Sequence, residues 1–199
     1  MDNKLDNEIG FHVNEAVPEY AKRYTYTDYL TWDDDKRREL IDGIPFLMSA
    51  PNRRHQKLSG RLYIQIAAFL KDRKCEVYYA PFDVRLNADT LDNTVVQPDL
   101  IIVCDHSILN DAGCKGAPDM AIEILSPSTS RYDRTLKFNT YLKAGIREYW
   151  VIDPETNTLA VHLLKNGSYI ISAYTDENEA VPVSILKGCV INLTEVFEE

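Results

Sequence analysis

The chain has 199 residues, a formal net charge of −9 at pH 7, and a hydrophobic fraction of 45%. This length suits one domain with a full hydrophobic core, since domains usually run to about 100–200 residues. The negative charge argues against a protein that coats nucleic acid without specificity, because such binding needs many lysine and arginine contacts to phosphates. Apolar runs are far shorter than the roughly 20 residues of a membrane span, so we expect no membrane insertion.

The N-terminal residues and the cysteines give an expectation for the cellular compartment of the protein. Residues 1–10 are polar and acidic and contain no apolar stretch, which predicts no secretory signal and a cytoplasmic location. The four cysteines are scattered and form no C-x-x-C pair. They are Cys75, Cys104, Cys114 and Cys189. We expect buried apolar thiols in a reducing compartment rather than zinc ligands.

The N-terminal part is predicted to form an arm, a short helix and a hairpin. Residues 1–25 lack periodicity and make up the expected arm. The expected short helix covers residues 29–34, with Thr27 and Thr31 as candidate caps. Asp42-Gly43 lies between two apolar segments and predicts a tight turn between two strands, because this dipeptide tolerates positive φ.

A basic amphipathic helix should follow from Asn52. Apolar residues recur at helical spacing as far as Leu70. The segment from Arg53 to Lys74 holds seven basic residues and one acidic residue in an otherwise acidic chain. This charge fits either a solvated helix face or an edge that meets phosphates.

Strands predominate after this helix. The expected strands cover residues 76–80, 83–86, 95–105 and 120–125. The last two contain apolar runs on both faces and should therefore be central. A second helix should begin at caps among residues 128–130 and end near Gly145. A strand at 148–152 and a hairpin around Asn166-Gly167 then follow, and the absence of repeats and flexible linkers predicts a single domain over residues 26–199.

Two acidic residues interrupt the predicted central strands. Asp99 precedes one apolar run, and Glu123 lies within the other. A buried charge is costly unless it is paired or bound to a cation. Since neighbouring strands lie about 4.8 Å apart, the two carboxylates could share one Mg²⁺ ion, which prefers oxygen ligands. Asp99 as a turn residue and Glu123 as the partner of an arginine are the structural alternatives.

A series of short motifs runs in order from about residue 25 to residue 165. They are Glu39-Leu40-Ile41-Asp42-Gly43, Ser49-Ala50-Pro51, His55, Gln97-Pro98-Asp99-Leu100, residues 123–129, Asp133, Lys137, Tyr141, Gly145 and residues 148–154. Together they resemble the Uma2 family of restriction-endonuclease-like proteins, within the PD-(D/E)XK nuclease superfamily.

The resemblance implies a fold and an activity. The expected fold is α/β (α+β), a restriction-endonuclease-like core with a mixed central sheet flanked by helices, plus an N-terminal hairpin and a C-terminal β extension. The implied activity is metal-dependent hydrolysis of phosphodiester bonds in DNA. Asp99 and Glu123 would be the metal ligands, and the cofactor would be Mg²⁺ or Mn²⁺. The rival interpretation is a catalytically degenerate fold that binds nucleic acid or protein without cleavage.

One departure from the superfamily pattern concerns its lysine. That lysine usually lies two residues after the second acid, and Leu125 occupies this position. Lys137, on the following helix, is the candidate replacement. Its structural alternative is an exposed pair with Asp133, worth only about 0.3–0.5 kcal/mol. Asp119 is a less favoured first acid, because four strand residues put it about 13 Å from Glu123.

His55, Glu39 and the aromatic pair Tyr149 and Trp150 each have a functional and a structural interpretation. His55 could contact phosphate or transfer a proton, although a structural histidine is an equal alternative. Glu39 could add a third acidic ligand or merely lie at a strand edge. Tyr149 and Trp150 are expected in the core rather than as base-stacking residues. A homodimer is also expected to suit a nuclease that cuts two strands, with the C-terminal β segment as its interface.

Overall fold

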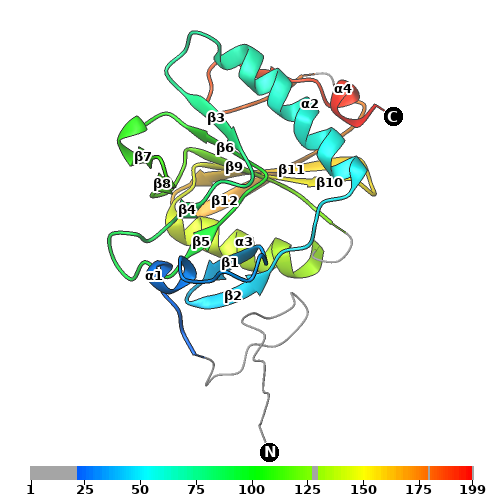
Figure 1. The fold of residues 1–199 in the computed structure, drawn as a ribbon. Coiled ribbons are helices and arrows are strands. Elements are labelled where there is room, and N and C mark those ends of the chain that lie inside the picture. The colour runs from blue at the N-terminus through cyan, green and yellow to red at the C-terminus, as the bar shows by residue number, and fades with distance from the viewer. Residues whose placement is uncertain (1–21, 127–129, 179, 199) are drawn as a thin grey trace, which may run out of the picture.

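The structure is a computed structural model that describes residues 22–126, 130–178 and 180–198 (Figure 1). The helices are α1 (Tyr26–Tyr29), α2 (Arg53–Leu70), the 3-10 helix η1 (His106–Ile108), α3 (Ser130–Ala144) and α4 (Leu193–Phe197). The strands are β1 (Arg38–Ile41), β2 (Ile44–Leu47), β3 (Glu76–Tyr79), β4 (Val84–Arg85), β5 (Val95–Val96), β6 (Leu100–Val103), β7 (Leu109–Asn110), β8 (Gly113–Lys115), β9 (Met120–Ile124), β10 (Glu148–Asp153), β11 (Thr158–Lys165), β12 (Ser168–Thr175), β13 (Val181–Pro182) and β14 (Val190–Ile191).

The main sheet has six strands in the order β12-β11-β10-β9-β6-β3. Only the β9–β10 pair is parallel among its described neighbours, because α3 provides the crossover between these two strands. The apolar strands β6 and β9 lie inside the sheet, where a continuous apolar run is buried on both faces. The sheet is therefore mixed, as expected.

Helices and a second sheet cover the main sheet on its two faces (Figure 1). On one face, α2 packs Leu58, Leu62 and Ile66 against the sheet, together with α4 and the C-terminal segment. On the other face, α3 and the smaller strands form a second core, to which Tyr141 and Tyr149 belong. The candidate site lies where the ends of β6 and β9 meet α3 and the hairpin β1–β2.

The hairpin β1–β2 belongs to a second sheet with the order β2-β1-β5-β4-β8-β7. Asp42 and Gly43 take φ values of 47° and 80°, as the predicted turn requires. β1 pairs with β5 through Leu40 and Val95, which anchors the hairpin beside the strand that leads to β6. The sequence reading did not anticipate this sheet.

Several predicted elements are confirmed. Helix α2 begins after Asn52, whose side chain accepts a hydrogen bond from the backbone of His55. The hairpin β11–β12 turns at Asn166 and Gly167, both with positive φ. The expected core residues Tyr149 and Trp150 are buried. The fold class is the one expected.

The prediction of a short helix at residues 29–34 was wrong. Helix α1 ends at Tyr29, and its cap is Thr25 rather than Thr27 or Thr31. The Thr25 side chain accepts from the backbone of Asp28, and the Asp28 carboxylate accepts from the backbone of Thr25. This reciprocal capping box fixes the helix start at Tyr26, three residues earlier than expected. Of the caps expected for α3, residues 128 and 129 lie outside the described part of the chain, and Ser130 is the first residue of the helix.

The prediction that all four cysteines are apolar thiols was also wrong. Cys75 and Cys104 form a disulfide between β3 and β6. The antiparallel register pairs Glu76 with Val103, so that the cysteines follow as the next opposed pair. Their separation of 29 residues in the sequence concealed this proximity. Cys114 and Cys189 are buried free thiols.

Among the residues that the structure describes, no helix is both long enough and apolar enough to cross a membrane.

Candidate active site

Strand pairing brings Asp99 and Glu123 to one place. β6 and β9 are antiparallel with Leu100 opposite Ile122, and the next step of this register sets Asp99 opposite Glu123. Both acidic side chains line one cavity of about 110 Å³. The backbone N–H of Ile124 donates to Oδ2 of Asp99 at 2.7 Å, which ties the two strand ends together. The carboxylates thus share one side of the sheet, as the sequence reading required.

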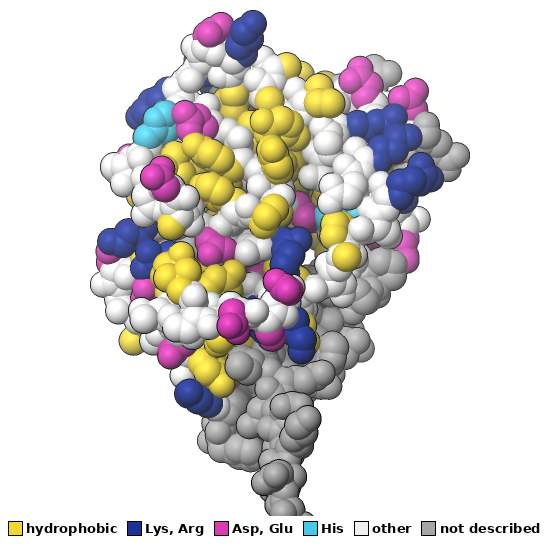
Figure 2. Space-filling model, viewed as in Figure 1, with side chains coloured by type: hydrophobic (Ala, Val, Ile, Leu, Met, Phe, Trp, Pro, Cys, Tyr) yellow, Lys and Arg dark blue, Asp and Glu magenta, His cyan; other side chains and the backbone are white. Residues whose placement is uncertain are grey.

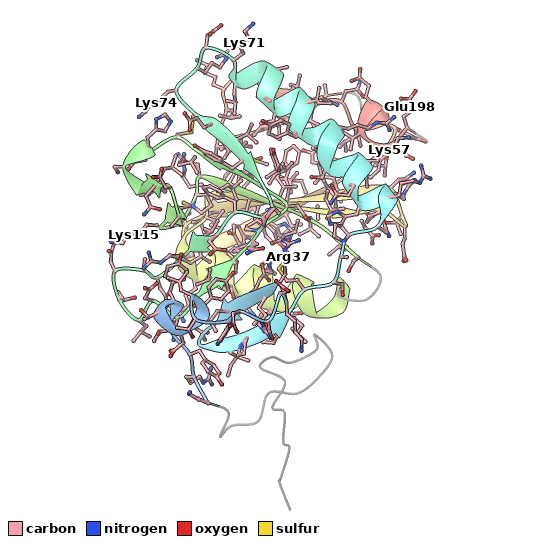
Figure 3. All side chains as sticks on the ribbon, in the orientation of Figure 1. Arg37, Lys57, Lys71, Lys74, Lys115 and Glu198 are labelled. Atoms are coloured by element: carbon pink, nitrogen blue, oxygen red, sulfur yellow. A yellow bond between two sulfur atoms is a disulfide. The ribbon has the colours of Figure 1, made fainter. Side chains whose placement is uncertain are left out.

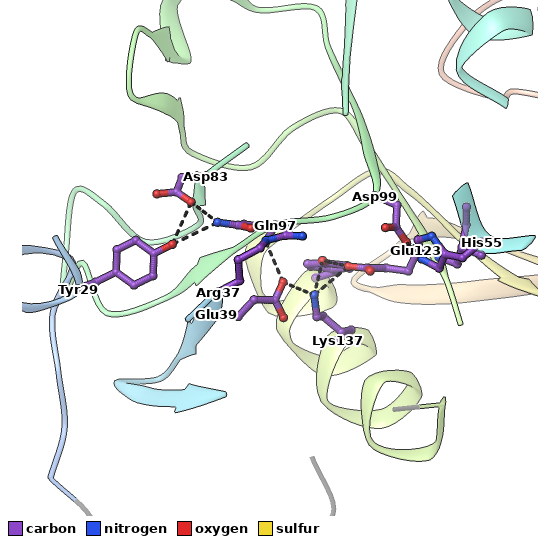
Figure 4. A network of polar contacts seen from close by, with 11 residues as sticks. Tyr29, Arg37, Glu39, His55, Asp83, Gln97, Asp99, Glu123 and Lys137 are labelled. Carbon is purple, nitrogen blue, oxygen red and sulfur yellow. Dashed lines mark hydrogen bonds and ion pairs between the residues drawn. The ribbon is translucent and has the colours of Figure 1, made fainter. Parts of the chain in front are cut away.

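Lys137 bridges two of the acids in the cavity (Figure 4). Its ammonium nitrogen lies 2.5 Å from Oε1 of Glu39 and 2.9 Å from Oε1 of Glu123. The Lys137 side chain is 4% exposed, so these contacts form largely out of water. Helix α3 packs on the sheet behind β9 and projects Lys137 back toward the strand ends. The structure therefore brings together Glu39, Glu123 and Lys137 from three separate elements.

Tyr141 adds a neutral donor to Glu123. It lies one helical turn after Lys137, on the same face of α3, and its hydroxyl donates to Oε1 of Glu123. Burial, with the charges of Asp99 and Glu39, raises the pKa of Glu123 to about 8 against the opposing effect of Lys137. Burial also raises the pKa of Tyr141 well above its ordinary value, so the phenol stays protonated and continues to donate.

His55 contacts the other acid. His55 lies in the first turn of α2, and its Nε2 is 3.2 Å from Oδ2 of Asp99. Its Nδ1 is buried and has no hydrogen-bond partner among the described residues. Because His55 is buried and touches a carboxylate of the cavity, the structure places it within the candidate site.

Gln97 links the hairpin to the segment that carries Asp99, just before β6. Its backbone N–H donates to Oε1 of Glu39 at 2.7 Å. Its side-chain nitrogen donates to Asp83 at 2.8 Å and to the hydroxyl of Tyr29 at 3.2 Å, and its side-chain oxygen accepts from Arg37 at 2.7 Å. Figure 4 shows this chain of contacts leading toward Lys137.

The sequence reading did not assign a role to Arg37, Gln97 or Tyr141. The signals were spacings: Arg37 and Gln97 each lie two residues before a candidate acid, the distance that puts strand residues on one face. Tyr141 lies four residues after Lys137, the distance that puts helical residues on one face. Such spacings are too common to identify a site unless the facing elements are known.

Two other residues weighed from the sequence lie elsewhere. Asp119 accepts from the backbone of Cys104 at 2.6 Å and pairs with Arg147, at the opposite end of β9 from the cavity. Leu125 is 4% exposed and packs in the core beneath α3. Asp133, the alternative partner of Lys137, has no described side chain.

The donor set of the cavity suits a hard divalent cation. Mg²⁺ is commonly held by one or two carboxylates together with waters and substrate oxygens. Oδ1 of Asp99 and Oε2 of Glu123 accept no hydrogen bond from any described residue, so each carboxylate keeps an oxygen for a ligand. Within the described part of the chain, no three or more His, Cys, Asp or Glu side chains gather in a group that could hold a metal ion. The fit thus rests on two carboxylates.

Some basic side chains of α2 make structural hydrogen bonds, and others are exposed to solvent. Arg54 donates to the backbone oxygen of Pro154, and Arg61 donates to that of Val196. Figure 3 shows Lys57 and Lys71 at opposite ends of α2. On the face drawn in Figure 2, basic and acidic side chains are interspersed rather than gathered into one basic surface.

The mixed sheets with their flanking helices form a restriction-endonuclease-like fold. The model of the Uma2 family, described as "Putative restriction endonuclease", matches residues 26–194. The chain belongs to the Uma2 family.

Two individual proteins illustrate the relationship. The chain is 26% identical over 151 residues to the "Uncharacterized protein slr1290" of Synechocystis, a match that covers 74% of this chain and 78% of that protein. Its fold matches the crystal structure of "a putative nuclease belonging to DUF820" from Anabaena variabilis with a TM-score of 0.71 and 21% identity. That match covers 87% of this chain and 97% of the other, and at this identity it shows the shared fold.

Proposed function

We propose that this protein is a metal-dependent endonuclease that hydrolyses phosphodiester bonds in DNA. The observation that supports the proposal most directly is the opposition of Asp99 and Glu123 in one cavity, with Lys137 2.9 Å from Glu123. Membership of the Uma2 family supports the same class of reaction. DNA rather than RNA, and the need for a metal, are parts of the proposal.

Asp99 and Glu123 would hold Mg²⁺ or Mn²⁺ through the oxygens that no described residue occupies. When bound, such a cation supplies the positive charge that polarises a phosphodiester. His55 keeps Asp99 in place through Nε2, and Tyr141 keeps Glu123 in place through its hydroxyl. These contacts orient the two carboxylates before a ligand arrives, which reduces the cost of reorganising the site.

Lys137 would have the role that a lysine on the strand has in other members of the superfamily. The Leu125 side chain is buried in the core, whereas the Lys137 ammonium contacts the carboxylate of Glu123 from α3. An ammonium group there offsets the negative charge that accumulates on phosphate oxygens during hydrolysis. Glu39 holds the other side of the ammonium and fixes its position.

The second candidate function is a degenerate nuclease fold that binds a partner without cleavage. The observation in its favour is the ion-pair network itself, since Lys137 already neutralises part of the charge that would attract a cation. Binding of Mn²⁺ separates the two functions, because a module without catalysis has no reason to hold the ion at Asp99 and Glu123.

The test compares purified wild-type protein with Asp99→Ala, Glu123→Ala and the control Asp89→Ala. Asp89 is an exposed acid paired with Lys115, away from the cavity. We expect cleavage of plasmid DNA in Mg²⁺ or Mn²⁺ by the wild type and the control, and none by the other two variants, with folding checked by circular dichroism. Equal cleavage by all four proteins would refute the assignment, and calorimetry without any Mn²⁺ binding would favour the interaction module.

The proposal includes a homodimer, since two sites related by a two-fold axis can address both strands of a duplex. Sedimentation analysis of the purified chain tests this part independently of activity.

A further inference from the structure

Arg37 contributes to the same cavity as the acids of the candidate site. Its side chain lines the cavity together with Asp99, Glu123 and Lys137 (Figure 4). Arg37 is exposed to solvent, whereas the Lys137 side chain is 4% exposed and lies between Glu39 and Glu123. A ligand that enters from solvent therefore meets the guanidinium before the ammonium.

A neutral acceptor orients the Arg37 guanidinium. Nη2 of Arg37 donates to Oε1 of Gln97 at 2.7 Å. Gln97 is fixed in turn, because its backbone N–H donates to Glu39 and its side-chain nitrogen donates to Asp83. The amide oxygen of Gln97 is thus the atom that faces Arg37, and it holds the guanidinium without neutralising it.

Arg37 forms no ion pair with a carboxylate in the described part of the chain, although its charge acts on Asp83 and lowers the pKa of that residue against the larger effect of burial. The neighbouring Arg38 pairs with Asp34, and Arg85 pairs with Asp92. By contrast, no described carboxylate oxygen lies within 4.0 Å, the limit for an ion pair, of a guanidinium nitrogen of Arg37. A guanidinium carries five N–H donors, and the contact with Gln97 uses one of them. The planar arrangement of the others matches two oxygens of a phosphate.

We propose that Arg37 binds two oxygens of the substrate phosphodiester at the mouth of the cavity and positions the phosphate against Asp99 and Glu123. The proposal rests on the proposed nuclease function for its substrate class, and it adds a substrate-positioning residue that neither the family motifs nor the strand pattern identifies. Lys137, held by two acids, then serves the reacting centre while Arg37 captures the substrate.

The experiment measures binding of thymidylyl-(3′→5′)-thymidine, a dinucleotide with one phosphodiester and no other phosphate, by NMR titration with and without Ca²⁺. The variants are Arg37→Gln, Arg37→Lys and the matched control Arg147→Gln. Arg147 is also an exposed arginine, but it pairs with Asp119 at the far end of β9. Thermal unfolding of each variant shows whether the fold is intact.

We expect Arg37→Gln to weaken dinucleotide binding by about tenfold or more, Arg37→Lys to weaken it less, and Arg147→Gln to leave it unchanged. Equal affinity of Arg37→Gln and the wild type, or no binding by the wild type in either condition, would overturn the proposal. Arg37-dependent binding in a protein that cleaves no DNA would uphold the phosphodiester site and contradict the hydrolytic function, so the two failures are distinguishable.

Discussion

The ammonium nitrogen of Lys137, on α3, lies 2.9 Å from a carboxylate oxygen of Glu123, on β9, and 2.5 Å from one of Glu39, on β1. One buried cation thus joins a helix, a central strand and the hairpin of the second sheet. With Glu39, Glu123 and Asp99 all ionised, the three carboxylates exceed the one ammonium by two negative charges, and a proton on Glu123, whose pKa burial raises to about 8, reduces this excess to one. Under the proposed function, this excess of negative charge would favour the binding of a divalent cation.

Replacement of Lys137 by Met should lower the free energy of unfolding by about 3 kcal/mol or more, because it leaves Glu39 and Glu123 buried without the ammonium group that pairs with them. Added Mn²⁺ should restore part of the loss if the carboxylates bind it. The control is Lys143→Met on the same helix, where the side chain is 76% exposed and the expected change is within about 0.5 kcal/mol. Urea denaturation measures both, and equal losses in the two variants would contradict the structural role.

Binding of Mn²⁺ should strengthen as the pH rises from 6 to 8. The pKa of Glu123 is raised to about 8 by burial, so below that pH the ion-free carboxyl holds a proton that a cation must displace. The affinity should therefore increase by up to about tenfold per pH unit and become constant above pH 8. Calorimetry in two buffers of different ionisation enthalpy would detect the released proton at pH 6.5.

Tyr141→Phe provides the control for this pH dependence. The hydrogen bond from Tyr141 lowers the pKa of Glu123, so its loss should raise that pKa and move the whole binding profile to higher pH. Binding that does not vary with pH in either protein would mean that Glu123 is not the proton-releasing ligand.

Glu148→Gln should destabilise the protein by about 1–3 kcal/mol. Glu148 is fully buried and accepts from Nε1 of Trp150 at 2.8 Å and from the backbone of Ile185 at 2.9 Å, which fastens the C-terminal segment to β10. A glutamine would turn one N–H group toward these donors. The exposed Glu177→Gln is the matched control, and a thermal midpoint for Glu148→Gln as high as for the control would be inconsistent with this anchoring.

The unfolded, unreduced chain should present two reactive thiols, Cys114 and Cys189, and the reduced chain four. The disulfide between Cys75 and Cys104 closes a separation of 29 residues, so its reduction should lower the free energy of unfolding by roughly 3 kcal/mol through the freedom regained by the unfolded chain. Thiol titration and urea denaturation with and without reductant measure these effects. The double variant Cys75→Ser/Cys104→Ser should not respond to reductant.

Local patterns account for the elements that could be predicted. The extent of α2 follows from its apolar spacing and the Asn52 cap, and the two hairpins follow from Asp42-Gly43 and Asn166-Gly167. Asp99 and Glu123 stood out because each carries charge beside or within an apolar strand. The start of α1 was misplaced because a capping box at Thr25 was overlooked.

The sequence by itself determined the long helices, the strands of the main sheet and the β1–β2 hairpin, the carboxylates at central strands, and the family that the motifs resemble, because these depend on neighbouring residues. Only the tertiary structure decided that Lys137 and Glu39 meet Glu123, that Gln97 orients Arg37, and that Cys75 faces Cys104. These contacts depend on strand register and on the rotation of α3 against the sheet. Both are set by packing between segments far apart in the chain, which no local pattern encodes.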